Sequence, residues 1–126
     1  MVTIEQIIDT LGNVDRSLPV FVETILDNGA TVRTSPGRIE SWRGSYELPT
    51  LYPDGGTART AGGFRAYLTK RVGGPMTGYK GGDYSVPGDR ALWADDYGDC
   101  DYWSIVGTRV ESDAVVLIRA QGATTW

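Results

Sequence analysis

Apolar residues near the start of the chain recur at the spacing of a helix. Ile4, Ile7, Ile8 and Leu11 fall on one helical face. The segment Thr3-Ile4-Glu5-Gln6 just before them has the form of a capping box, with Thr3 as N-cap and Gln6 reaching back. Gly12 is expected to end the helix in a left-handed conformation. The pattern therefore predicts a short N-terminal helix.

A second helical face is predicted between about Thr60 and Val72. Phe64, Tyr67, Leu68, Arg71 and Val72 share one side of this segment. Lys70 and Arg71 suit the negative end of a helix, and Gly73-Gly74-Pro75 ends it.

The other apolar segments indicate β-strands, separated by turn signals. The predicted strands are 18–22, 31–34, 38–46, 84–86, 91–94, 102–110 and 114–118. Asp27-Asn28-Gly29 and Glu111-Ser112-Asp113 are typical of hairpin turns, Ser35-Pro36-Gly37 predicts a break, and Pro49–Gly63 predicts a loop. Together these elements predict one α+β domain over residues 1–126. It would have a mainly antiparallel or mixed sheet with two helices packed on it.

Charge and composition disfavour several classes of function. The formal net charge is −4, from 12 basic and 16 acidic residues, which disfavours broad nucleic-acid binding. The chain has no histidine, so the usual general base near neutral pH is missing and most hydrolase mechanisms are disfavoured. No apolar run reaches a membrane span and the start lacks a signal peptide. We therefore expect no membrane association and a cytoplasmic location.

No cofactor or metal site is predicted. The single Cys100 lies between Asp99 and Asp101, whose negative charge disfavours the reactive thiolate. Asp95, Asp96, Asp99 and Asp101 have oxygen ligands of the kind that calcium or magnesium prefers, without the spacing of an EF-hand. A solvated acidic turn is the favoured interpretation, and cation binding there stays open.

Two segments combine aromatic rings, one cation and glycine, and they are the best candidates for a ligand site. The first contains Trp42, Arg43 and Tyr46; the second contains Tyr79, Lys80, Gly81, Gly82, Asp83 and Tyr84. Rings can stack on a flat ligand, a cation can bind phosphate, and glycine lets backbone N–H groups approach closely. A buried strand and a hairpin turn are the structural alternatives for the two segments.

Strand periodicity sets a condition on the first segment. Trp42 and Tyr46 share one face of an extended strand, and Arg43 points to the other. Arg43 could contact the same ligand only if a bulge or the end of the strand turned its side chain toward that face. The second segment is therefore the better candidate for direct ligand contact.

Three motifs together resemble a known family. Ser41–Tyr46, Gly78–Tyr84 and Leu92–Gly98 are similar to the SWRGSY-like, GYKGGDY-like and WVANYG-like segments of small, poorly characterised proteins of bacteriophages and some bacteria. The third motif departs from the pattern at Ala94-Asp95-Asp96. The resemblance implies a phage-type accessory protein and no catalytic residue.

Two functions follow as hypotheses. The first is a non-enzymatic binding module for a small anionic ligand such as a nucleotide or nucleotide signal. The alternative is a protein that inhibits a host enzyme through an acidic, aromatic surface. An enzyme using Asp83 and Lys80 comes third, because histidine is absent. A homodimer is also expected, since small sheets with exposed edges commonly pair.

Overall fold

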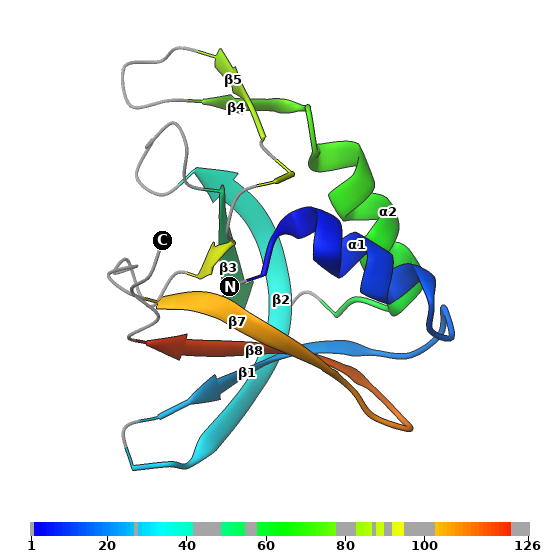
Figure 1. Cartoon of the computed structure of the whole chain (residues 1–126), viewed down its shortest axis with the longest axis vertical. Helices are drawn as coiled ribbons and strands as arrows, with labels where there is room; N and C mark the ends of the chain where they lie inside the picture. Colours follow the sequence, from blue (N-terminus) through cyan, green and yellow to red (C-terminus); the bar gives the residue numbers. More distant parts are fainter. Residues whose placement is uncertain are drawn as a thin grey trace.

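Six strands of the chain close into a barrel (Figure 1). The computed structural model describes residues 2–26, 28–41, 49–54, 58–77, 83–86, 88–89, 92–94 and 103–121. The barrel strands, in chain order, are β1 (Val20–Ile25), β2 (Thr31–Ser41), β3 (Pro49–Asp54), β6 (Trp93–Ala94), β7 (Trp103–Val110) and β8 (Val115–Gln121).

The barrel is mixed rather than purely antiparallel. Neighbouring strands run in the order β1-β2-β3-β6-β7-β8, and β8 pairs with β1 to close the ring. The β1–β8 and β3–β6 pairs are parallel, and the other four described pairs in the ring are antiparallel. With two helices beside it, this sheet confirms the predicted α+β fold.

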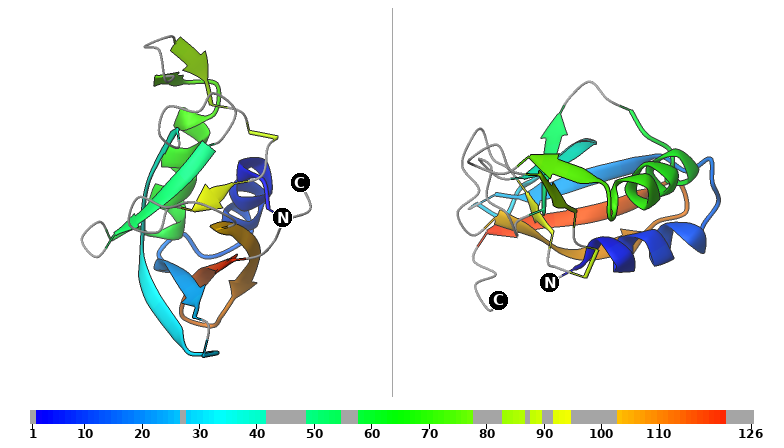
Figure 2. Two further views of the ribbon diagram at one scale, coloured as in Figure 1. Left: turned by 90° about the vertical axis from the view of Figure 1, so that its left-hand side faces the viewer. Right: turned by 90° about the horizontal axis from the view of Figure 1, so that it is seen from above.

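Two helices pack against each other on one side of the barrel, as Figures 1 and 2 show. They are α1 (Ile4–Gly12) and α2 (Ala61–Arg71). The short strands β4 (Pro75–Thr77) and β5 (Asp83–Ser85) form a separate hairpin beyond the C-terminal end of α2. Neither described helix has the length and apolar character needed to cross a membrane.

The start of α1 is as predicted and its end is not. The Thr3 side chain accepts a hydrogen bond from the Gln6 backbone, and the Gln6 side chain accepts one from the Thr3 backbone, which completes the capping box. Gly12 is the last helical residue, and it does not have the positive φ of a left-handed stop. Asn13 ends the helix instead, donating from its backbone to Thr10.

The predicted break at Ser35-Pro36-Gly37 is wrong, because β2 continues through it as a bulge. The register with β3 shifts between Ser35 and Arg38, so that one extra residue is accommodated in β2. Gly37 has a φ of 70°, and a Cβ there would lie 1.8 Å from the carbonyl oxygen of Tyr52. Only glycine fits this combination of backbone conformation and close strand approach.

The predicted loop at Pro49–Gly63 is also wrong over its first part. Residues 49–54 form β3, and Thr50 and Leu51 are fully buried inside the protein. The proline and glycine content suggested a loop, but pairing with β2 and β6 supplies the backbone hydrogen bonds of a strand.

The main core lies between the two helices and the barrel. Its fully buried members include Ile4, Ile7, Phe64, Leu68, Val22, Ile39, Leu51, Leu92, Ile105 and Leu117. Both helices thus turn their predicted apolar faces inward. The opposite faces of the two helices carry exposed residues.

Candidate functional site

The predicted ligand-binding residues fall largely outside the residues that the structure describes. Trp42, Arg43 and Tyr46 belong to 42–48, and Tyr79, Lys80, Gly81 and Gly82 belong to 78–82. The backbone of Asp83 and Tyr84 is described in β5, where these residues pair with Thr77 and Met76. Cys100 and the acidic turn at 95–101 also lie outside the described residues. The contribution of both motifs to a site stays a prediction.

One face of α2 anchors the helix to the bulged strand β2. The hydroxyl of Tyr67 accepts a hydrogen bond from the Ile39 backbone N–H at 2.8 Å. Arg59, just before the helix, donates from Nε to the Gly37 carbonyl at 2.9 Å. Its guanidinium lies 4.1 Å from the centre of the Tyr67 ring, close enough for a cation–π interaction. We call this group the β2 anchor; it holds α2 in place.

The opposite face of α2 lines a groove of about 570 Å³ against α1. Residues 62, 65, 66, 69 and 70 follow one another at helical spacing and form one stripe along the helix. The residues that line the groove are Leu11, Gly12, Arg16, Gly62, Arg65, Ala66, Thr69 and Lys70. Three of these eight are cations and none is an acid. We call this the helix groove.

Arg65 is held across the end of α1. Its Nε donates a hydrogen bond to the Ile8 carbonyl near the C-terminal end of α1, at 3.2 Å. A Cβ at Gly12 would lie 2.9 Å from the same Nε and 3.1 Å from the guanidinium carbon. The missing side chain at Gly12 therefore makes the space in which the Arg65 guanidinium lies.

Arg16 is brought to the groove by backbone pairing with the start of α2. Gly62 N–H donates to the Arg16 carbonyl at 3.0 Å, and Ala61 N–H donates to Leu18 at 2.7 Å. These bonds use N–H groups that the first turn of a helix leaves open. The anion-attracting chemistry of the groove therefore comes from side chains rather than from the helix terminus.

The neighbouring carboxylate of Asp15 forms no ion pair with Arg16 among the described residues. Asp15 accepts hydrogen bonds from the backbone and hydroxyl of Ser17 at 2.9 and 2.8 Å, and the backbone bond in particular lowers the Asp15 pKa. Arg16 and Lys70 are exposed, and within the described part of the chain their side chains form no ion pair. Although the protein has a net charge of −4, the three charged residues that line the groove are all cations.

The barrel holds a contrasting set of charges. Glu23, Arg33, Arg109 and Glu111 form a closed ring of four ion pairs with N–O distances between 2.8 and 3.1 Å. The side-chain hydrogen bond from Arg109 lowers the pKa of Glu23, and the one from Arg33 lowers the pKa of Glu111. Each arginine in this charge ring has two carboxylate partners, which suits it for holding strands together.

Sequence reasoning missed the groove because its cations are far apart in the chain. Arg16 follows α1, whereas Arg65 and Lys70 belong to α2. The available signal was the stripe of small residues and cations at 62, 65, 66, 69 and 70, on the side of the helix away from Phe64 and Leu68. Only the packing of α1 against α2 brings Arg16 and Gly12 to that stripe.

Comparison with protein-family models, with curated proteins and with solved structures found no match. Among the residues that the structure describes, no group of three or more acids or cysteines gathers where a metal ion could be held. The groove geometry is therefore the basis for a functional assignment.

Proposed function

We propose that the chain is a non-enzymatic binding module for a small anionic ligand, in the phage-type accessory role that its motifs imply. The observation that carries the proposal is the helix groove, where Arg16, Arg65 and Lys70 line one concave surface with no carboxylate among the lining residues. Arginine forks and lysine ammonium groups are the side chains that proteins use for phosphate and carboxylate ligands. A nucleotide is the ligand class that the sequence predicts.

The cations of the groove are better suited to a ligand than to stabilising the fold. Exposed charges of this kind contribute little to stability even when paired. The Arg65 guanidinium is fixed by its bond to Ile8, so a ligand would meet a pre-positioned donor and would lose less side-chain entropy on binding. The nucleotide hypothesis also retains the residues of the two motifs as predicted contacts: Trp42, Arg43, Tyr46, Tyr79, Lys80, Gly81, Gly82, Asp83 and Tyr84.

A thermal-shift screen tests the proposal. Mono-, di-, tri- and cyclic nucleotides are added at low ionic strength to the purified chain, because a ligand that binds only the folded state raises its melting temperature. The double variants Arg16→Gln/Lys70→Gln and Arg43→Ala/Lys80→Ala are screened in parallel. Arg38→Gln removes an exposed arginine that lies over Tyr52, outside the groove lining, and is the matched control.

The proposal expects a rise in melting temperature that the Arg16→Gln/Lys70→Gln variant loses and the Arg38→Gln variant keeps. A rise that is lost only in Arg43→Ala/Lys80→Ala moves the site to the predicted motifs and contradicts the groove assignment. No rise with any of these nucleotides contradicts nucleotide binding. That result would favour the alternative function, inhibition of a host enzyme through an acidic, aromatic surface.

A further inference from the structure

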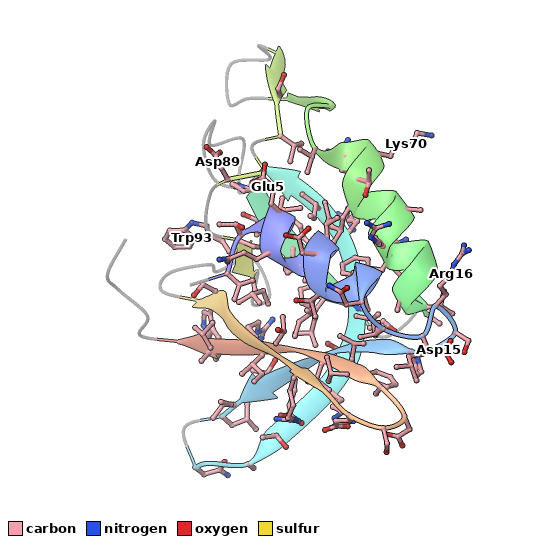
Figure 3. All side chains as sticks on the ribbon, turned by 45° about the vertical axis from the view of Figure 1, so that its right-hand side comes forward. Glu5, Asp15, Arg16, Lys70, Asp89 and Trp93 are labelled. Carbon is pink, nitrogen blue, oxygen red and sulfur yellow. The ribbon has the colours of Figure 1, made fainter. Side chains whose placement is uncertain are left out.

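The cations of the helix groove are spread along its length. Figure 3 places Arg16 and Lys70 at opposite ends of α2, and Arg65 lies between them in the stripe. Arg16 packs against Gly62, since a Cβ there would lie 3.0 Å from the Arg16 Nε. From residue 62 to residue 70 the helix advances about 12 Å. One compact anion cannot contact both ends of such a row.

The groove also lacks the parts needed to recognise a nucleobase. Its described lining contains no aromatic residue, and Thr69 carries its one neutral polar side chain. The Thr69 hydroxyl already donates to the Arg65 carbonyl at 2.8 Å. Leu11 and Ala66 offer apolar contact without a flat surface for stacking. The lining can therefore distinguish ligands by charge and length, and not by base identity.

We propose, on the basis of the proposed function, that the helix groove binds a chain of linked phosphates. Each phosphate in the chain carries charge, so an extended chain places anionic oxygens near Arg16, Arg65 and Lys70 together. The arginines can donate two parallel hydrogen bonds to phosphate oxygens, and Lys70 supplies a mobile point charge at the far end. A free polyphosphate and the phosphate tail of a nucleotide share this chemistry.

Isothermal titration at low salt separates the possibilities, with orthophosphate, tripolyphosphate, citrate, ATP and GTP as the probes. We expect tripolyphosphate to bind at least about tenfold more tightly than orthophosphate or citrate, because it reaches more of the cations. The dissociation constants of ATP and GTP should differ by less than about threefold, because the lining has no groups that distinguish the two bases. ATP as tight as tripolyphosphate supports the proposal with a nucleotide tail as the source, and weaker ATP supports it with free polyphosphate.

Single variants test whether one chain spans the groove. Arg16→Gln and Lys70→Gln should each weaken tripolyphosphate binding about tenfold, although they lie at opposite ends, and the control Arg38→Gln should leave it unchanged. Melting temperatures of the variants, measured without ligand, confirm that each still folds.

Two sets of results overturn the inference in distinguishable ways. If orthophosphate or citrate binds as tightly as tripolyphosphate, or if ATP and GTP differ more than about tenfold, the phosphate-chain proposal is wrong while anion binding in the groove stands. If no probe binds, or if both charge-removing variants bind like the wild type, the proposed function of the groove fails as well.

Discussion

The two faces of α2 use the same kinds of residue for opposite purposes. On the barrel side, Arg59 is committed to the Gly37 carbonyl and the Tyr67 ring. On the groove side, Arg65 has one backbone partner, and Lys70 forms no ion pair with a described residue. The comparison teaches that the surroundings of a cation decide its role. Arg59 is satisfied by contacts within the fold, whereas the groove cations keep donors that we propose bind a ligand.

Breaking the β2 anchor at Gly37 should have the largest effect on stability. In Gly37→Ala the new Cβ would meet the Tyr52 carbonyl oxygen at 1.8 Å in a backbone conformation that alanine disfavours. We expect a loss of about 3 kcal/mol or more in the free energy of unfolding, measured by urea denaturation. The control is Gly29→Ala, which has a φ of 83° and no atom within 4 Å of the new Cβ, and should lose about 1 kcal/mol. Equal losses would show that the close approach is unimportant.

Removing one hydroxyl from the β2 anchor should have the next largest effect. Tyr67→Phe keeps the ring beside Phe64 and Arg59 but leaves the Ile39 N–H without its acceptor. An unsatisfied buried donor costs about 1–3 kcal/mol, which urea denaturation can measure. Thr10→Ala removes an exposed hydroxyl bonded to Gln6 on α1 and should change stability little. A neutral Tyr67→Phe variant would mean that packing alone holds α2 on β2.

The charge ring predicts how stability depends on pH. The folded-state pKa values of Glu23 and Glu111 lie below the ordinary value of 4.5. Their contribution to stability is therefore complete above that pH, and it is lost as the pH falls through the lowered folded values. Denaturation curves between pH 7 and pH 3 should show this loss in the wild type. Glu23→Gln should lower stability at pH 7 and flatten the decline below pH 5, whereas an unchanged decline would assign the acid sensitivity to other carboxylates.

In the helix groove we expect a substitution that lowers ligand affinity and leaves the free energy of unfolding nearly unchanged. Gly12→Ala replaces glycine by a better helix former, which offsets the displacement of Arg65, so the free energy of unfolding should change by less than about 1 kcal/mol. Tripolyphosphate affinity should nevertheless fall about threefold or more, because the Arg65 guanidinium has to move. Titrations of Gly12→Ala, Arg65→Gln and the double variant form a cycle. An additive double variant would show that Gly12 does not act through Arg65.

Local patterns in the sequence predicted the local parts of the fold. The capping box of α1, the apolar face of α2 and the hairpins joining β1 to β2 and β7 to β8 depend on neighbouring residues, and all were confirmed. The bulge at Gly37 and the burial of β3 depend on pairing with distant strands, and there the sequence predicted a break and a loop. Proline and glycine indicate irregular backbone, but they do not show whether a partner strand accommodates it.

The helix groove was also hard to predict, because its residues come together through contacts between distant parts of the chain. Arg65 and Gly12 meet only when α1 packs against α2, and no short motif contains both. The motif at Trp42 and Arg43 was conspicuous because its residues are adjacent in the sequence. The signal that the sequence did carry is the stripe of small residues and cations at 62, 65, 66, 69 and 70.

The parallel closure of the barrel has a consequence for how the protein is made. β1 can pair with β2 soon after both leave the ribosome, but its other edge pairs with β8, so that Val20 lies beside Val115. Until β8 has been synthesised, that edge keeps unpaired N–H and C=O groups that can attract strands of other chains. Long-range pairing of this kind slows folding and prolongs the exposure. The barrel can therefore close only after β8 has been synthesised.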